Sequence, residues 1–300
     1  MKTRHFCVVV MTAVIMTASA VAADLPSRKD DPLPAPPPPM WTGFYVGLNA
    51  GGTWSNSNSA NVASAPFWTI PGLNGDVLGA SAISASAYNP ANTGGFIGGG
   101  QIGYNWRIAG SFVTGIEADI QGIAGNGGAG SSANVAAIAG ALVPTHVATV
   151  VGTSKSLDYL GTVRGRIGYL ATPTLLIYGT GGLAYGGVSS STTIWQSASF
   201  IDTTVPWGST GAFSDTRVGW AAGGGIEWMF MSNWSAKVEY LYYDLGSVTY
   251  NSSPLVVTST LFGAETASLP STRVRFNGNI VRAGLNYHFN WGSAPVIAQY

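Results

Sequence analysis

The chain has 300 residues, of which only 9% are charged, while glycine (41), tyrosine (13) and tryptophan (10) are abundant. Because a soluble domain is usually about a quarter charged, this composition argues against both a plain soluble enzyme and a disordered chain. The 13 basic and 13 acidic residues balance. The sequence therefore offers no basic surface for a nucleic acid, and we predict no nucleic-acid partner.

The first residues predict an export signal. Lys2 and Arg4 precede an apolar run over 6–15 and then small residues up to Ala23, which is the pattern of a signal peptide over 1–23. A retained N-terminal membrane anchor would need a longer apolar stretch. The only cysteine, Cys7, lies inside this signal, so the mature chain is expected to have no disulfide.

Residues 24–40 contain a proline cluster that favours an extended conformation without a core. We interpret this segment as a periplasmic spacer, with a ligand for a proline-recognition domain as the alternative. From residue 41 onward, apolar residues alternate with small or polar ones, which is the period of a strand with two unlike faces. Eight such runs cover residues 42–54, 94–106, 111–122, 155–169, 175–188, 216–230, 235–247 and 273–289.

The connections between these runs alternate in length. Long connections cover 55–93, 123–154, 189–215 and 248–272, whereas tight ones cover 107–110, 170–174 and 231–234. Outer-membrane barrels have this asymmetry, with short periplasmic turns and long external loops. We therefore predict an all-β fold over 41–289, an eight-stranded antiparallel transmembrane β-barrel with four long extracellular loops and three short periplasmic turns.

Aromatic residues recur near the expected periplasmic ends of the strands. Such rings settle at the membrane interface, so they predict an aromatic girdle. The girdle residues are Phe44, Tyr104, Trp106, Tyr169, Trp228, Phe230, Tyr287 and Phe289.

The opposite face of the same strands carries five acids and five bases. Burying them in a soluble β-sandwich would be prohibitive, whereas a membrane barrel turns its polar face inward. They are Glu117, Asp119, Asp158, Arg164, Arg166, Arg217, Glu227, Lys237, Glu239 and Arg282. We expect them to pair as an ion network that plugs the lumen and leaves no open channel.

Three strand segments resemble the opacity-type surface antigens, the small outer membrane immunogenic protein barrels. The segment WTGFYVGLNAGG at 41–52 resembles the family's first strand, WSAKVEYLYYDLG at 234–246 its seventh, and VRAGLNYHF at 281–289 its closing strand. The resemblance implies an eight-stranded barrel in the cell outer membrane that is exposed at the surface. The expected partners are outer-membrane lipids and, during biogenesis, the barrel-assembly machinery; the sequence identifies no surface partner.

The C-terminus departs from the family pattern, in which a terminal aromatic closes the last strand and serves as the assembly signal. Here Phe289 is followed by further residues up to a terminal Tyr300. Either aromatic can be the recognised one, and we interpret 290–300 as a periplasmic tail.

Catalytic and cofactor chemistry finds little support in the sequence. The glycine-rich segment 98–103 has the spacing of a dinucleotide-binding loop, but strand-like residues follow it where a helix is required. Neither His146 nor His288 is followed by the His-x-Ser arrangement of barrel lipid deacylases. Glu117 with Asp119 is the nearest thing to a catalytic carboxylate pair, and we interpret it as part of the ion network. We predict no catalytic residue, metal or cofactor.

These observations favour a barrel that contributes to membrane integrity and carries an antigenic, interacting surface. One alternative is a narrow porin-like channel for small solutes. Another is the capture of hemin by loops, because some members of this family bind it. The loop residues that could contact hemin are His146, Trp68, Trp195 and Trp207.

Overall fold

The computed structural model describes residues 41–67, 75–125, 127–138, 145–198, 206–259 and 263–289. The predicted signal peptide (1–23), the proline-rich spacer (24–40) and the tail (290–300) lie outside these residues and stay predictions. No helix in the described ranges is long and apolar enough to cross a membrane.

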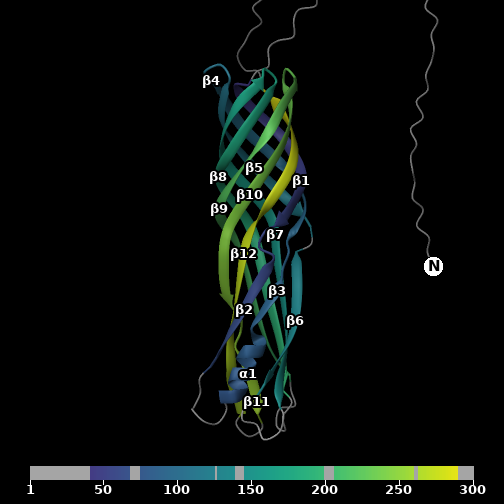
Figure 1. Ribbon diagram of the computed structural model, residues 1–300, viewed down its shortest axis with the longest axis vertical. Coiled ribbons are helices and arrows are strands. Elements are labelled where there is room, and N and C mark those ends of the chain that lie inside the picture. Colours follow the sequence, from purple (N-terminus) through teal and green to yellow (C-terminus); the bar gives the residue numbers. More distant parts are fainter. Residues whose placement is uncertain are drawn as a thin grey trace, which may run out of the picture. The chain divides into compact units, whose positions relative to one another are not determined.

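Eight strands form a closed ring in which each strand pairs with its two neighbours in antiparallel fashion (Figure 1). The order is β1, β4, β5, β7, β8, β9, β10, β12, and β12 pairs back onto β1. The strands are β1 (Gly43–Ser55), β4 (Gly94–Ile108), β5 (Phe112–Ala124), β7 (His146–Thr172), β8 (Leu175–Ala198), β9 (Trp207–Met231), β10 (Trp234–Asn251) and β12 (Gly263–His288). Each predicted alternating run lies, to within one residue, inside one of these ring strands.

Three tight turns join ring strands at one end of the barrel. The turn after β4 uses Ala109 and Gly110, both with positive φ (44° and 73°), a conformation that glycine adopts without steric cost. The other two turns are residues 173–174 and 232–233. These turns fix the register, so alternate residues of every strand face the lumen.

At the opposite end the structure differs from the predicted loops. The described residues of the long connections form further strands and a helix, and β7, β8, β9 and β12 run on beyond the ring. The additional elements are β2 (Ser59–Pro66), α1 (Gly75–Ala85), β3 (Ala87–Pro90), β6 (Gly128–Ala137) and β11 (Leu255–Ser259). Their Ser, Thr, Ala and Gly content looked loop-like, but small alternating residues can also pair as strands when a long neighbour offers an edge. We call this part of the molecule the extension.

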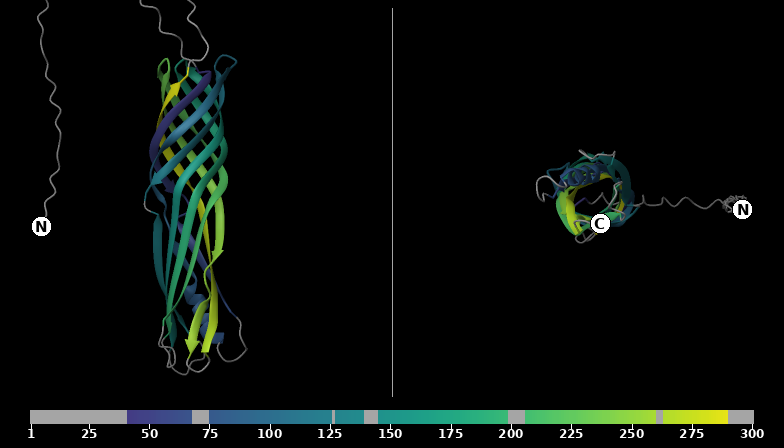
Figure 2. Two further views of the ribbon diagram at one scale, coloured as in Figure 1. Left: turned by 180° about the vertical axis from the view of Figure 1, so that it is seen from behind. Right: turned by 90° about the horizontal axis from the view of Figure 1, so that it is seen from below.

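The extension is two sheets with a helix between them. The pairing of β9 with β10 stops at Trp220 and Asp244, just before Gly246, which has a positive φ of 82°. Beyond that point one sheet contains β6, β7, β8 and β9, and the other contains β3, β2, β12, β10 and β11; no ladder joins β9 to β10 or β3 to β6 among the described residues. Helix α1 contacts β6 and β7 of one sheet and β2 and β12 of the other, and Figure 2 shows it within the strands at this end.

The interior is layered along the barrel axis. A small apolar cluster containing Trp41 and Leu176 lies nearest the tight turns. Charged side chains come next, and then an apolar layer that includes Leu160, Leu241 and Phe276. A second apolar cluster, which includes Leu78 of α1, fills the space between the two sheets of the extension.

Candidate functional site: the lumen

Alternation along five ring strands brings eight of the predicted charged residues together inside the barrel. They are four acids, Glu117, Asp119, Glu227 and Glu239, and four bases, Arg164, Arg166, Lys237 and Arg282, and all are buried. We call these eight residues the lumen network. Cross-strand register supports it, because Glu117 lies directly opposite Arg164, and Glu239 lies directly opposite Arg282.

Arg164 and Arg282 form the centre of the lumen network. Arg164 contacts Glu117 at 2.7 Å, Asp119 at 2.9 Å and Glu239 at 3.1 Å. Arg282 contacts Asp119 at 2.8 Å and Glu239 at 2.6 Å. These carboxylates are therefore shared between two guanidinium groups, and the centre of the lumen is filled by hydrogen-bonded ion pairs.

The remaining pairs extend this cluster towards the tight turns. Lys237 Nζ donates to both oxygens of Glu117 at 2.8 and 2.7 Å. Arg166 pairs with Glu227 at 2.5 Å, and its guanidinium stacks over the ring of Tyr178 at 4.5 Å. With four charges of each sign, the buried cluster is neutral, which offsets much of the cost of removing the charges from water.

Two of the predicted residues lie outside the lumen network. Asp158 is exposed and accepts a hydrogen bond from Ser156 at 2.9 Å. Arg217 is half-buried near Gly246, and no ion pair involves it in the described part of the chain. Both residues belong to the extension. Asp158 lies at a register shift between Leu157 and Tyr159, which alternation alone cannot anticipate.

Sequence reasoning missed the uncharged residues that complete the lumen. Tyr45 donates to Glu117 at 2.7 Å, Tyr178 donates to Glu239 at 3.1 Å, and Asn286 donates to Glu227 at 2.8 Å. Gln101 also donates to Asn286. Strand alternation could have identified these residues. Each is at an even spacing from a lumen-facing residue of its own strand, or is paired across the sheet with a residue that is.

His288, Ser235 and Glu227 meet near the tight-turn end of the lumen. His288 Nε2 lies 2.9 Å from Ser235 Oγ and 3.5 Å from Glu227 Oε1, and Ser235 itself donates to Glu227 at 2.6 Å. A hydrolytic triad needs the acid on one imidazole nitrogen and the nucleophile on the other. Here both groups face the same nitrogen and Ser235 is fully buried, so the geometry is that of a structural contact.

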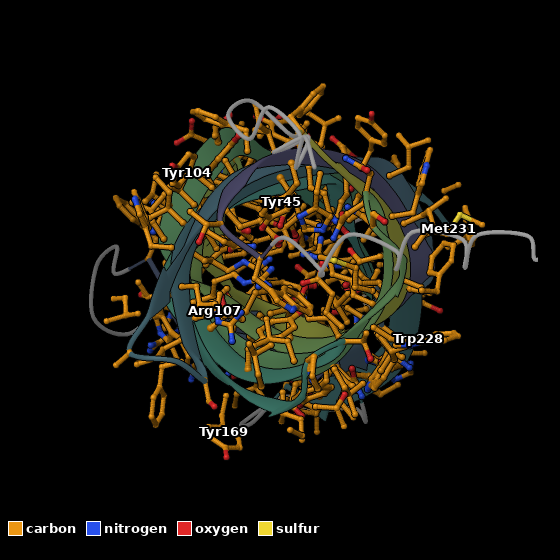
Figure 3. The ribbon with its side chains drawn as sticks, turned by 90° about the horizontal axis from the view of Figure 1, so that it is seen from above. Tyr45, Tyr104, Arg107, Tyr169, Trp228 and Met231 are labelled. Atoms are coloured by element: carbon orange, nitrogen blue, oxygen red, sulfur yellow. The ribbon has the colours of Figure 1, made fainter. Side chains whose placement is uncertain are left out.

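The predicted girdle residues form an outward-facing aromatic cluster at the tight-turn end. Figure 3 shows Tyr104, Tyr169 and Trp228 pointing away from the lumen, whereas Tyr45 points into it. Phe44 packs edge-on against Tyr104 with ring centres 4.6 Å apart, and Tyr104 lies 4.6 Å from Trp106. The other neighbouring pairs are Trp228 with Phe230 at 5.8 Å and Tyr287 with Phe289 at 5.2 Å.

A second row of exposed aromatics, which the sequence analysis did not identify, lies further along the same strands. It contains Trp54, Phe96, Trp220 and Tyr240, and we call it the outer girdle. Trp54 is ten residues from Phe44 along β1, and Trp220 is eight residues from Trp228 along β9. These intervals are close to the 9–11 residues of a transmembrane strand, and the strand faces between the two girdles carry exposed aliphatic side chains such as Leu48 and Ile116.

The described residues among those suggested for hemin capture do not line one site. Trp68 lies outside the described residues, and Trp207 is buried with its Nε1 donating to Gln196 at 2.8 Å. Trp195 is exposed and pairs across the sheet with Val150. Val150 is four residues from His146 along β7, which places Trp195 about 13 Å from His146 along the strand direction. In the described part of the chain, no three His, Cys, Asp or Glu side chains are grouped as metal ligands.

The lumen, the two girdles and the closed ring define a β-barrel of the outer-membrane class. The model of the family described as "Outer membrane protein beta-barrel domain" matches residues 11–289, and the chain belongs to this family. The "31 kDa outer-membrane immunogenic protein" of Brucella melitensis is 34% identical over 284 residues, covering 92% of this chain and 96% of the relative. The predicted family and the outer-membrane location are thereby confirmed.

Two further comparisons give weaker similarity. The "22 kDa outer membrane protein" of Rhizobium leguminosarum is 32% identical over 155 residues, which is 51% of this chain and 55% of the relative. Among solved structures, the outer membrane protein OprG from Pseudomonas aeruginosa covers 84% of this chain and 99% of its own, with a TM-score of 0.38 and 10% identity.

Proposed function

We propose that this outer-membrane protein is a closed barrel that holds an ordered module, the extension, outside the cell. Its role is then structural and interactive: the barrel contributes to membrane integrity and the extension provides the antigenic surface. In outer-membrane barrels the tight turns face the periplasm and the longer connections face the exterior. The proposal therefore gives the extension the external side.

The lumen network is the observation that supports this proposal most strongly. A porin-like path needs charged side chains that line water, whereas these eight residues are buried against one another. The apolar layer and α1 follow the lumen network along the same axis. A hydrated solute would have to displace all three layers to pass.

Single-channel conductance of the refolded full chain in a planar bilayer tests the proposal. A difference in gel migration between unheated and heated samples shows that the barrel is folded before the protein is added to the bilayer. A general porin in the same bilayer serves as the positive control. We expect a folded barrel with no stepwise conductance. Steady, reproducible steps from folded protein would contradict the closed lumen and make the porin-like alternative the leading function.

A variant sharpens this test by opening the lumen without changing its net charge. Arg164→Ala combined with Glu239→Ala removes one base and one acid of the lumen network. If the lumen network is the main barrier, the folded double variant should conduct or flicker while the parent stays silent. Silence of both proteins would assign the barrier to the apolar layer and α1, and the lumen would still be closed.

A further inference from the structure

Two arginines of β12 point away from the barrel just beyond the outer girdle. Arg273 and Arg275 are two residues apart on one face of the strand, and both are exposed. Arg275, with 52% of its side chain exposed, pairs with Asp244, and no ion pair involves Arg273 in the described part of the chain. The outward-facing charge of Arg273 is therefore not neutralised by a described ion pair, and this needs an explanation in a chain with so few charges.

Hydrogen-bonding groups flank these arginines on both neighbouring strands. Arg273 lies directly between Thr249 of β10 and Asn61 of β2, and Arg275 lies opposite Ser247 of β10. All three neighbours face the same side as the arginines and are exposed. The five residues Asn61, Ser247, Thr249, Arg273 and Arg275 form what we call the arginine patch.

The outer girdle fixes the depth of the arginine patch. Asn277 and Asn279 lie on the same face of β12 as Arg275, on the side towards the outer girdle. Asn277 donates to Tyr242 at 3.0 Å, and Tyr240 donates to Asn279 at 2.7 Å. Tyr242 also packs against Trp220 with ring centres 5.4 Å apart. Arg275 is two residues beyond Asn277 along β12, or about 7 Å, and Arg273 is four residues beyond it, or about 13 Å. Because such amphipathic rings settle at the level of the headgroups, both arginines are expected among the polar headgroups.

The charge around the extension is unevenly distributed. Among side chains described beyond the outer girdle, Arg273 and Arg275 are the exposed guanidinium groups, whereas Lys155 is buried and Arg217 half-buried. The exposed acids Asp158 and Asp215 belong to β7 and β9, in the other sheet of the extension. Among the described side chains, an anion at headgroup depth therefore meets exposed guanidinium groups on the β2, β12 and β10 side of the barrel.

We propose that the arginine patch binds the phosphate group of a phosphorylated glycolipid in the outer leaflet. Two guanidinium groups match the oxygens of a phosphate in geometry and charge. The neighbouring hydroxyl and amide groups can hydrogen-bond the remaining phosphate oxygens or the sugar. The inference goes beyond the closed lumen and rests only on the external orientation of the extension given under the proposed function.

Binding of lipid A to the refolded protein in mixed micelles tests the inference. Bisphosphorylated and dephosphorylated lipid A are titrated separately, and lipid retained on the folded barrel is counted by native mass spectrometry. The test variant is Arg273→Gln with Arg275→Gln. The matched control is Arg107→Gln, which removes an exposed arginine beside the tight turn at the other end of the barrel. Unheated gel migration confirms that each protein is folded.

We expect the parent and Arg107→Gln to prefer the phosphorylated lipid by about tenfold or more, and the double variant to lose that preference. A double variant that keeps the preference would overturn the inference, as would a parent without one. Loss of the preference in EDTA would also overturn it, because binding would then depend on a divalent cation and not on guanidinium groups. Displacement of the lipid by inorganic phosphate alone would identify a free-phosphate site instead. None of these outcomes depends on whether the lumen conducts.

Discussion

In the half of the barrel next to the tight turns, every strand pairs with two neighbours and four acids meet four bases inside. In the extension, no ladder joins β9 to β10 or β3 to β6 among the described residues, the interior is filled by aliphatic and hydroxyl side chains, and α1 lies between the two sheets. The first half is stabilised by backbone hydrogen bonds around a closed ring, with ion pairs inside it. The second is held by side chains that bridge sheets no longer joined by a ladder.

The two halves also differ in how a single change should propagate. A closed ring leaves the lumen residues no alternative partners, so an unpaired charge stays buried. In the extension, hydroxyl groups rotate and water can reach the seams between the sheets. We therefore expect large, global effects from lumen substitutions and smaller, local ones from the extension.

Arg164→Ala should produce the largest loss of stability. It takes from Glu117, Asp119 and Glu239 one of the two guanidinium groups that they share and leaves the closed lumen network with an excess negative charge. Removing one partner of a buried ion cluster costs about 3–5 kcal/mol. The urea midpoint of unfolding in micelles, followed by gel migration, measures the loss. Arg107→Ala, at an exposed turn, is the control. A loss no larger than that of the control would mean that water fills the lumen.

Gly103→Ala should cost up to about 3 kcal/mol, because an added methyl group forces a packed interior to move. A Cβ at this position would lie 2.4 Å from the ring of Tyr45, whose hydroxyl donates to Glu117. Gly100→Ala on the same strand is the matched control, since its Cβ would meet only ordinary contacts. Equal urea midpoints for the two variants would show that Tyr45 is not fixed in the lumen.

Gln196→Ala tests how α1 is held in the extension. The side chain of Gln196 accepts from Ser81 at 2.7 Å and from Trp207 at 2.8 Å, and it donates to Thr149 at 2.8 Å. Its loss should cost about 1–2 kcal/mol, less than a fully unpaired buried group, because the hydroxyls can find other partners. Protease cleavage within α1 should increase while the ring stays folded. The exposed neighbour Ser197→Ala should leave cleavage unchanged, and an equally protected α1 in both variants would refute this role.

Lys155, where the two halves meet, should give an effect that depends on pH. Its Nζ donates to the carbonyl of Ser57 at 2.9 Å and faces the ring of Phe276, and burial lowers the pKa of Lys155 to about 8. The unfolded chain then binds more protons than the folded one between about pH 8 and pH 10.4, so stability should rise with pH across this window. Comparing urea midpoints near pH 7 and pH 9.5 for the parent and Lys155→Met isolates this contribution. An identical pH dependence in both proteins would contradict it.

The sequence predicts the first half far better than the second. Strand alternation identifies the ring strands and eight lumen charges, because in a closed barrel each position has one of two environments. The same reasoning fails for Asp158, because a register shift changes which way it faces, and for Arg217, because the β9–β10 ladder has already stopped before that residue. It also fails for β6 and α1, whose small residues form regular structure only because longer strands and a second sheet lie beside them.

Hydrogen exchange of β9 backbone amides tests the difference between the halves most directly, because one strand passes through both. Residues 221–228 pair with β8 and β10, whereas residues 211–218 pair with β8 alone. We predict slow exchange throughout 221–228, and rapid exchange of about half of the amides in 211–218, those that point towards β10. Uniformly slow exchange along the whole strand would contradict the account, because the barrel would then continue unbroken into the extension.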